Sequence, residues 1–448
     1  MIDKFIILFE QKLKDRHLNE LLKGCSVALV LKVFGISTGY IFILLVTRNF
    51  GAEVMGILAL SFTILQISTV IGCLGFDTAL LRFVAEYSSQ NRPDLVKEVY
   101  VKAIEIIIPF SLFLSVFLFF STPYISKYIF HKENLSIYFQ IVSFAILPMV
   151  LVSINSASLR GLKKIKEYMF LKEVSIFLFS TIMLVVILFF LREKYVPIIA
   201  YTISLIFVAF LSLVIWLKNS KLNLISHKNS LKLKDILNTS LPMLLASSLI
   251  FIMQWTDTIM IGMIRSEAEV GIYNVTLKVA MLTSVGLFAI NSIAAPKFAE
   301  FYGKRDMKGL AKIVQQSTKL IFWSSFPILL ILFIFPSFIL GIFGGEFKVG
   351  VFALIILALG QFVNSISGSV GYILQMTGKH KVFQNIILAA TIINIVLNAI
   401  LIPVYGINGA AFASMVSLIF WNLTSVVYIR TNLNIMTLYI PLLKVREV

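Results

Sequence analysis

The amino-acid sequence predicts an all-α polytopic membrane protein with twelve transmembrane helices. Of its 448 residues, 59% are hydrophobic and only 14% are charged, a balance that is not typical of soluble domains. Apolar runs of about 18 residues or more recur along the whole chain, and a helix of that length crosses about 30 Å of hydrocarbon. We therefore expect no sizeable soluble domain beside the spans.

The predicted spans fall into two groups of six. The first six lie at residues 24–46, 57–77, 103–123, 135–157, 171–191 and 196–217. The second six lie at residues 241–263, 272–296, 319–341, 350–375, 384–403 and 408–429.

Three segments lie outside these groups. Residues 1–23 place their apolar side chains at helical spacing among basic ones, which predicts an amphipathic helix on the cytoplasmic face. A charged anchor that fixes the topology is the alternative for this segment. We interpret residues 218–240 as a basic cytoplasmic linker and residues 431–448 as a cytoplasmic tail.

The net charge of +17 is spread unevenly over the connections. Thirty of the 39 lysine and arginine residues lie in the terminal segments and in every second connection, whereas the alternate connections hold seven. This asymmetry predicts a multi-pass protein of the cytoplasmic membrane with both termini in the cytoplasm. The basic residues then orient the chain and contact anionic membrane lipids, and we expect no nucleic-acid partner.

An internal repeat relates the two groups of spans. Gly56 in EVMGILALS and Gly271 in EVGIYNVT are 215 positions apart, as are Lys164 and Lys379 in later connections. Because six crossings return the chain to its starting side, the two halves have the same orientation and are related by an axis along the membrane normal. We therefore expect two six-helix lobes with a cavity between them, formed by residues 24–217 and 241–430.

Several runs resemble the polysaccharide-biosynthesis flippases, of the superfamily that also contains the multidrug and toxic compound extruders and the lipid II flippases. The runs are TRNFGAEVMGILAL, LRGLKKIKEY and YGINGAAFASMVS, and the likeness covers nearly the whole chain. The resemblance implies the V-shaped pair of lobes of the multidrug extruders. It also implies export of oligosaccharides, of O-antigen or capsule type, that are linked to a polyprenyl diphosphate. We expect a monomeric transporter that works by alternating access.

Lys32 lies near the middle of the first span, where an ionisable group costs about 2.5–3.5 kcal/mol unless it faces protein or water. Ala28, Gly35 and Gly39 share its helical face, and small residues suit an interface or a cavity. Because an ammonium is a good partner for phosphate, Lys32 is our first candidate for binding the diphosphate. The alternative is that its side chain extends toward the cytoplasmic surface.

Asp257 and Lys278 lie on consecutive predicted spans, each about 9 Å below the outer membrane surface by helical rise. A salt bridge between them is one interpretation of this equal depth. In the other, Lys278 binds the diphosphate, while Asp257 takes a coupling cation, H⁺ or Na⁺, or forms an outer gate.

Further charged residues lie at the ends of spans. Asp77, Arg82 and Glu86 cluster where the second span ends, which indicates either an interfacial set of ion pairs or an inner gate. Arg48 and Arg265 head matching outer connections and either attract the diphosphate or cap helix C-termini. Amides within the spans either bond sugar hydroxyls or bond across helices, and we assign neither role to Asn155, Asn291, Asn364, Asn394, Asn398 and Gln361.

Catalysis has little support in the sequence. The four histidines and two cysteines show no metal-ligand spacing, and no phosphate-binding glycine loop is present. We therefore expect no enzyme, no metal and no cofactor other than an H⁺ or Na⁺ gradient. The main alternative to a flippase is a cation-coupled multidrug exporter, which a cavity with more lysines than carboxylates argues against. A membrane polymerase or ligase is disfavoured by the short outer connections.

Overall fold

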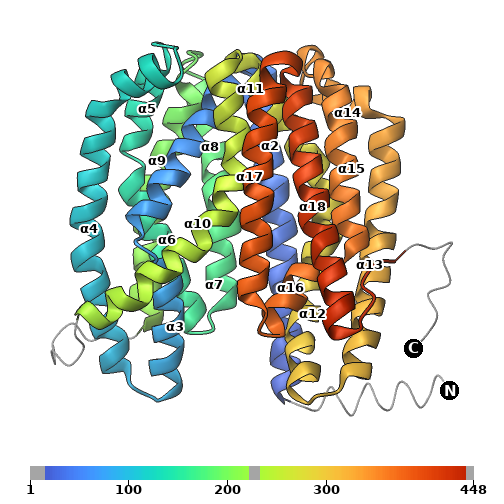
Figure 1. Ribbon diagram of the computed structural model, residues 1–448. Coiled ribbons are helices and arrows are strands. Elements are labelled where there is room, and N and C mark those ends of the chain that lie inside the picture. The colour runs from blue at the N-terminus through green and yellow to red at the C-terminus, as the bar shows by residue number, and fades with distance from the viewer. Residues whose placement is uncertain (1–15, 221–232, 440–448) are drawn as a thin grey trace. The chain divides into compact units, whose positions relative to one another are not determined.

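The computed structural model describes residues 16–220 and 233–439. All regular elements among these residues are helices (Figure 1), as predicted. Residues 1–15 of the amphipathic segment, 221–232 of the linker and 440–448 of the tail lie outside the described part, so those predictions remain open there.

The helices follow one another with short connections. Up to the linker they are α2 (Arg16–Gly72), α3 (Phe76–Ser89), α4 (Pro93–Tyr124), η1 (Ile125–Ile129), α5 (Leu135–Ser143), α6 (Ile146–Gly161), α7 (Ile165–Met169), η2 (Phe170–Ser175), α8 (Ile176–Leu188) and α9 (Val196–Ser220). Beyond it they are α10 (Leu233–Ile264), α11 (Glu267–Met281), η3 (Leu282–Ser284), α12 (Val285–Gly303), α13 (Met307–Ile334), α14 (Pro336–Phe343), η4 (Gly345–Gly350), α15 (Val351–Ser367), α16 (Val370–Met376), α17 (His380–Tyr405) and α18 (Ile407–Leu433).

The chain is a multi-pass membrane protein. In the described part, nine helices are long and apolar enough to cross a membrane, or ten if the bent pair α5 and α6 is one span. The predicted number of twelve is not confirmed. Two predicted spans are joined in α2, and α10 contributes only the shorter apolar section Phe251–Ile264.

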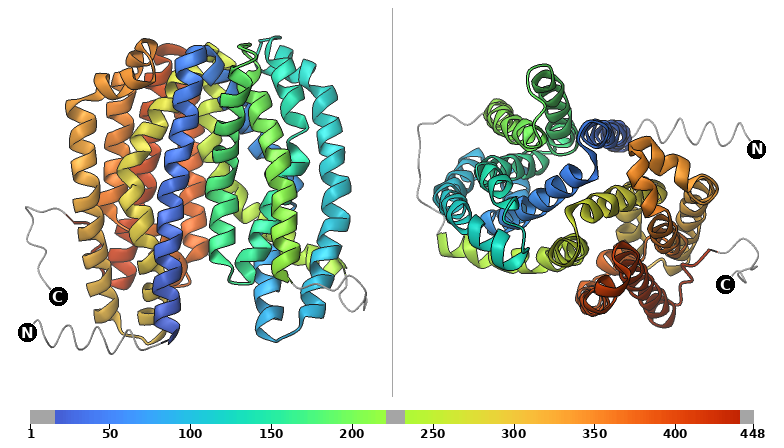
Figure 2. Two further views of the ribbon diagram at one scale, coloured as in Figure 1. Left: turned by 180° about the vertical axis from the view of Figure 1, so that it is seen from behind. Right: turned by 90° about the horizontal axis from the view of Figure 1, so that it is seen from above.

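Helix α2 is interrupted at Gly51, whose φ of 81° and ψ of −174° are not helical. Glycine adopts this backbone conformation without the steric cost that a side chain would bring. The N–H of Ala52, just after the break, donates to Glu346 Oε1 at 2.6 Å. Figure 2 shows the second section of α2, in blue, turning away from the first.

The described residues form two compact units, which we call unit 1 and unit 2. Unit 1 comprises the chain up to Phe42, Ser68–Phe117 and Ser143–Leu244. Unit 2 comprises Ile43–Ile67, Leu118–Val142 and the chain from Leu245 on. Unit 2 therefore includes ends of helices that the sequence places in the first half. The division into lobes at residues 218–240 stays a prediction.

A series of hydrogen-bonded polar side chains runs through the core of unit 1. Asn155 of α6 is fully buried, accepts from the Tyr100 hydroxyl at 2.7 Å and donates to Ser212 Oγ at 2.8 Å. The ring of Tyr100 lies 4.8 Å from that of buried Trp216. Asn155 therefore bonds across helices, one of the two alternatives that the sequence left open.

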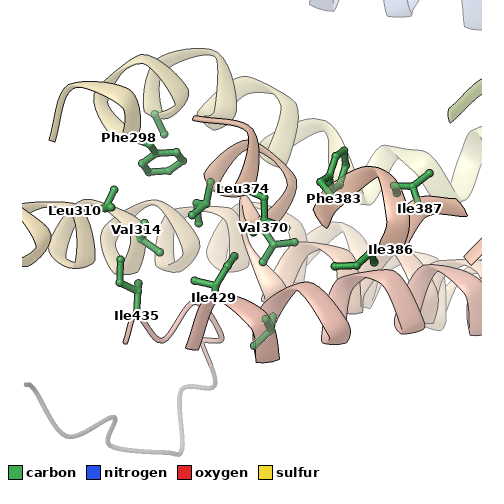
Figure 3. Packing of buried hydrophobic residues seen from close by; sticks show 13 residues of the cluster. Phe298, Leu310, Val314, Val370, Leu374, Phe383, Ile386, Ile387, Ile429 and Ile435 are labelled. Carbon is green, nitrogen blue, oxygen red and sulfur yellow. The ribbon is translucent and has the colours of Figure 1, made fainter. Parts of the chain in front are cut away.

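An apolar cluster in unit 2 joins α12, α13, α16, α17 and α18 (Figure 3). Phe298, Val314 and Val370 are fully buried within it. Between helices of a membrane protein, such side chains stabilise the fold through van der Waals packing. Phe383 and Ile387 belong to the cluster and also line the cavity described below, so the cluster forms one wall of that cavity.

Candidate functional site

Lys32 is held by a carboxylate. Its Nζ lies 2.6 Å from Glu173 Oε2, and the two side chains are 42% and 24% exposed. Both residues belong to unit 1. Glu173 lies in η2, a π-helical turn, and such turns occur frequently at functional sites. Binding of a diphosphate by Lys32 stays a prediction, and an anion there would compete with Glu173.

The small-residue face beside Lys32 is a helix interface. A Cβ added to Gly35 would overlap the carbonyl oxygen of Glu173, and one added to Gly39 would lie 3.7 Å from the Phe177 ring. The glycines thus allow α2 to approach η2 and α8 closely. This contact brings Lys32 within reach of Glu173.

Asp77, Arg82 and Glu86 all lie on α3 of unit 1. Asp77 is half-buried, whereas Arg82 and Glu86 are exposed. Within residues 16–220 and 233–439, no ion pair joins the three. An inner gate at this position stays a prediction.

Asp257 of α10 is 3% exposed and is surrounded by uncharged donors. Its carboxylate accepts from the Tyr273 hydroxyl at 2.5 Å, from Asn394 Nδ2 at 3.2 Å and from Asn398 Nδ2 at 2.6 Å. Ser414 Oγ donates to the same group. The carboxylate therefore accepts from these four neutral groups.

The network around Asp257 joins four helices of unit 2, namely α10, α11, α17 and α18. Asn394 and Asn398 are one turn apart on α17, so both amides point to one side of the helix. Asn398 uses both N–H groups, because it also donates to Asn394 Oδ1 at 3.1 Å. Its own Oδ1 is buried and has no hydrogen-bond partner in the described part of the chain. The network therefore contains a spare oxygen acceptor beside a carboxylate.

A cavity of about 520 Å³ lies entirely within unit 2. Asp257 and Lys278 are the two charged residues among those that line it. The sequence predicted that they lie at equal depth, and the structure brings both to this cavity. The unassigned amides Asn291, Gln361, Asn364 and Asn394 line it as well.

Five chain segments meet at one end of unit 2, which we call the linked end. These are the segments at residues 48–56, 130–134, 262–271, 341–346 and 402–406. At their centre Gly56 of α2 packs against Gly271 of α11. A Cβ on Gly56 would lie 2.9 Å from Gly271 N, and a Cβ on Gly271 would lie 2.8 Å from Gly56 N. The two glycines that the repeat pairs by sequence are therefore in contact.

Two arginines bind carbonyl groups at the C-terminal ends of helices at the linked end. Arg48 Nε donates to the carbonyl of Ile342 near the end of α14 at 2.6 Å. Arg265 donates to the carbonyls of Ile402 at 3.0 Å and of Pro403 at 2.8 Å, near the end of α17. A cation beside unpaired carbonyls of a helix C-terminus is favourable, so these contacts agree with the capping interpretation.

Lys132 makes the third contact of this type. Its Nζ donates to the carbonyls of Gly262, at 2.9 Å, and of Arg265 at the end of α10. It also lies 3.7 Å from Glu267 Oε2 in the first turn of α11. Burial lowers the pKa of Lys132, and the neighbouring Glu267 carboxylate partly opposes this shift.

The sequence interpretation missed the partners of its candidate residues. Glu173 lies near the beginning of a predicted span, whereas Lys32 lies near the middle of another, so helical depth did not pair them. Tyr273 is one helix away from Asp257, but Asn398 and Ser414 come 141 and 157 positions later. The one available signal was the buried amide pair Asn394 and Asn398 at a spacing of four.

A family model described as "Polysaccharide biosynthesis protein" matches residues 21–302. A second model, described as "MatE", matches residues 242–400.

Two relatives are archaeal. The "Probable low-salt glycan biosynthesis flippase Agl15" of Haloferax volcanii is 27% identical over 164 residues, which span 36% of this chain and 35% of that protein. An uncharacterized membrane protein of Methanocaldococcus jannaschii is 28% identical over 421 residues, or 89% of this chain and 95% of that protein.

Solved structures share the fold. The lipid II flippase MurJ in an inward closed conformation has a TM-score of 0.73 at 15% identity, with 91% of this chain and 87% of that chain covered. A multidrug resistance MATE family transporter in an inward-facing conformation has a TM-score of 0.71 at 15% identity, with 91% and 98% covered. At such identities the likeness shows the fold alone.

Proposed function

The chain belongs to the polysaccharide biosynthesis protein family, and from this premise we propose that it is a flippase for lipid-linked oligosaccharides. Its substrates are oligosaccharide units on a polyprenyl diphosphate, which it moves across the cytoplasmic membrane by alternating access, as a monomer with both termini in the cytoplasm. The similarity to a glycan biosynthesis flippase of Haloferax volcanii supports this substrate class. The charge asymmetry of the connections supports the orientation.

The observation that carries the proposal is the chemistry of the unit 2 cavity. A bare bilayer blocks the passage of a diphosphate and its sugars, because their charges and hydroxyls lose hydrogen bonds with water. The cavity offers polar groups inside a helical membrane protein, and Lys278 is the cationic residue of its lining. Lys278 binds the diphosphate in this proposal, and Lys32 does so after leaving Glu173.

Asp257 takes the coupling cation, H⁺ or Na⁺. Both carboxylate oxygens, Ser414 Oγ and the spare Oδ1 of Asn398 lie within one network. Oxygen atoms of this kind are the ligands that hard cations prefer, and a proton requires only the carboxylate. Asp257 also lines the cavity. A cation bound to Asp257 and a substrate bound in the cavity therefore contact neighbouring groups.

The linked end opens and closes during the cycle. Its contacts join Arg48 and Lys132, from the predicted first half, to carbonyls of the second half. Hydrogen bonds from side chain to helix end can break and form again without unfolding either helix. The end at which these contacts gather is the outer gate in this proposal.

A cation-coupled multidrug exporter is the second candidate, and the MatE match over residues 242–400 favours it. Exporters of organic cations need a carboxylate that is accessible to the drug. Here four neutral donors occupy Asp257, and Lys278 repels a cation. We therefore place this function second.

Deletion of the gene, with lipid-linked oligosaccharides followed by leaflet, tests the proposal. A flippase mutant accumulates finished units on the cytoplasmic leaflet. A multidrug exporter mutant becomes sensitive to cationic dyes and shows normal glycan lipids. A polymerase or ligase mutant exposes unpolymerised units on the outer leaflet, and either of these last two results would contradict the flippase.

A further inference from the structure

The lining of the unit 2 cavity combines amides with aromatic rings. Of its 33 lining residues eight are Asn or Gln, six are Phe, Tyr or Trp, and two are charged. An amide in a membrane protein is costly unless its N–H and C=O groups find partners. A cavity with so many amides therefore suits a ligand with many hydrogen-bonding groups.

Gln66 has a fixed orientation at this cavity. The indole Nε1–H of Trp255 is 2.9 Å from Gln66 Oε1. An indole N–H can only donate, so the amide oxygen must face Trp255 and the NH₂ group must point elsewhere. This NH₂ group donates to no other residue in the described part of the chain. Gln66 thus supplies two N–H donors in a defined direction.

Asn291 and Gln361 repeat this arrangement. Asn291 Oδ1 accepts from Ser369, and Gln361 Oε1 accepts from Ser284 at 2.7 Å. The NH₂ groups of both amides have no partner among the described residues. Asn364 and Gln375 also line the cavity, and their side-chain amides make no hydrogen bond within the described ranges. The lining therefore retains hydrogen-bonding capacity beyond what the helices use between themselves.

Three of the aromatic residues that line the same cavity are Trp255, Trp421 and Tyr372. Trp255 stacks on Phe251 with ring centroids 5.3 Å apart and planes at 10°. Trp421 meets Phe383 edge to face at 6.0 Å. Tyr372 is 40% exposed. The C–H-rich face of a pyranose, whose hydrogens carry partial positive charge, suits the negative face of such rings.

The charges argue for a mostly neutral ligand with one anionic group. The Asp257 carboxylate accepts four hydrogen bonds, and Lys278 is the other charged residue of the lining. A cavity of about 520 Å³ is of the size that holds a small-molecule ligand. A drug cation would meet a carboxylate that is only 3% exposed and already accepts four hydrogen bonds, in a wall that is not wholly apolar.

We infer that the unit 2 cavity is a glycan-binding site. It binds the neutral sugars nearest the diphosphate by stacking on Trp255, Trp421 and Tyr372 and by hydrogen bonds from Gln66, Asn291 and Gln361, beside Lys278. The inference rests on the proposed function and extends it, because it assigns sugar recognition to residues of unit 2 alone.

Two soluble probes separate sugar binding from diphosphate binding. Farnesyl diphosphate carries the anion alone, and farnesyl diphosphate bearing a neutral disaccharide of N-acetylglucosamine adds the sugars. Dissociation constants for both are measured by calorimetry on the full-length protein in lipid nanodiscs. We expect the disaccharide to improve the affinity of the wild-type protein about tenfold or more.

The substituted proteins are Trp421→Leu and Gln361→Met. Each should lose most of the advantage that the disaccharide gives, while its affinity for bare farnesyl diphosphate stays within about twofold of the wild type. This second value shows for each variant that the protein is folded. Trp323→Leu is the matched control, because Trp323 is 53% exposed and does not line the cavity.

Three results would overturn the inference in distinguishable ways. If both variants keep the full advantage of the disaccharide, the cavity does not bind sugars. If the wild type binds the two probes equally yet transports the sugar-bearing one into vesicles, the flippase function stands and the glycan site is wrong. If the wild type neither binds nor transports either probe, the proposed function itself fails.

Discussion

Helices α2 and α11 cross at Gly56 and Gly271, whose backbones are in contact although 215 positions separate them in the chain. Each would place an added Cβ within 3 Å of the other's backbone nitrogen, at 2.9 Å and 2.8 Å. The predicted internal repeat pairs these two glycines, so by that prediction the crossing joins equivalent helices of the two predicted halves.

Gly56→Ala and Gly271→Ala should each destabilise the protein by about 1–3 kcal/mol, because the new methyl group overlaps a carbonyl oxygen on the facing helix. Thermal unfolding in detergent measures the change. Gly303→Ala is the control, because a Cβ there meets no atom within 4 Å, and its effect should stay below about 0.5 kcal/mol. If all three variants unfolded at the same temperature, α2 and α11 could move apart to accept the methyl group without a loss of stability, and the prediction would be wrong.

Lys132→Met should weaken the linked end and lower the free energy of unfolding by about 1–2 kcal/mol. The substitution removes the donor to two carbonyls at the end of α10 and the ion pair to Glu267, and partly buried cations at helix C-termini contribute up to about that amount. Lys127→Met is the matched control. Its ion pair to Glu133 is between side chains that are 58% and 74% exposed, where such pairs contribute little. A Lys132 variant as stable as the Lys127 variant would contradict the assignment.

The same lysine makes stability depend on pH. Burial lowers its pKa in the folded protein below the ordinary 10.5, so in the range between the folded and the unfolded pKa the unfolded chain binds more protons. By linkage, stability then rises with pH in this alkaline range. The difference in unfolding temperature between the wild type and Lys132→Met should therefore grow as pH approaches 10.5. A difference that shrinks over this range would reverse the sign of the shift.

The sequence predicted much of the fold because apolar periodicity and charge placement depend on local composition. It predicted an all-helical membrane protein, which is confirmed, whereas the equivalence of Gly56 and Gly271 in an internal repeat stays a prediction. It did not predict the number of spans that the described residues support, because the break at Gly51 leaves α2 otherwise helical across two predicted spans.

The candidate site was predictable only in part. Asp257 and Lys278 share a cavity because helical rise fixes their depth. The donors around Asp257 come from α17 and α18, and nothing local to Asp257 indicates which later helices pack beside it. The pairing of Lys32 with Glu173 depends in the same way on close helix packing at Gly35.

Asp257→Asn should abolish ion coupling. The amide carries no charge for a cation to balance, and its NH₂ group faces groups that donate to the native carboxylate. Transport of a sugar-bearing lipid into proteoliposomes, with and without a Na⁺ or H⁺ gradient, measures the coupling. Asn155 is a core residue of unit 1, so Asn155→Asp is not a suitable control. The control is Asp306→Asn, because Asp306 lies at the exposed start of α13. Undiminished ion dependence in the Asp257 variant would exclude this role.

Lys32 and Glu173 have either a structural or a transport role, and a double-mutant cycle separates the two. If Lys32 binds the diphosphate, Lys32→Met should reduce transport at least about tenfold, Lys32→Arg should retain most of it, and Lys32→Met with Glu173→Met should stay inactive. If the pair only holds α2 against η2, Lys32→Met alone leaves the Glu173 charge without its partner, and the double variant removes that destabilising charge. Transport in the double variant would then recover toward that of the wild type.

Measured in the same vesicles, Glu173→Gln adds a second criterion. It frees Lys32 from its 2.6 Å contact, so a diphosphate-binding lysine should then take farnesyl diphosphate more tightly, whereas a purely structural one would leave that affinity unchanged.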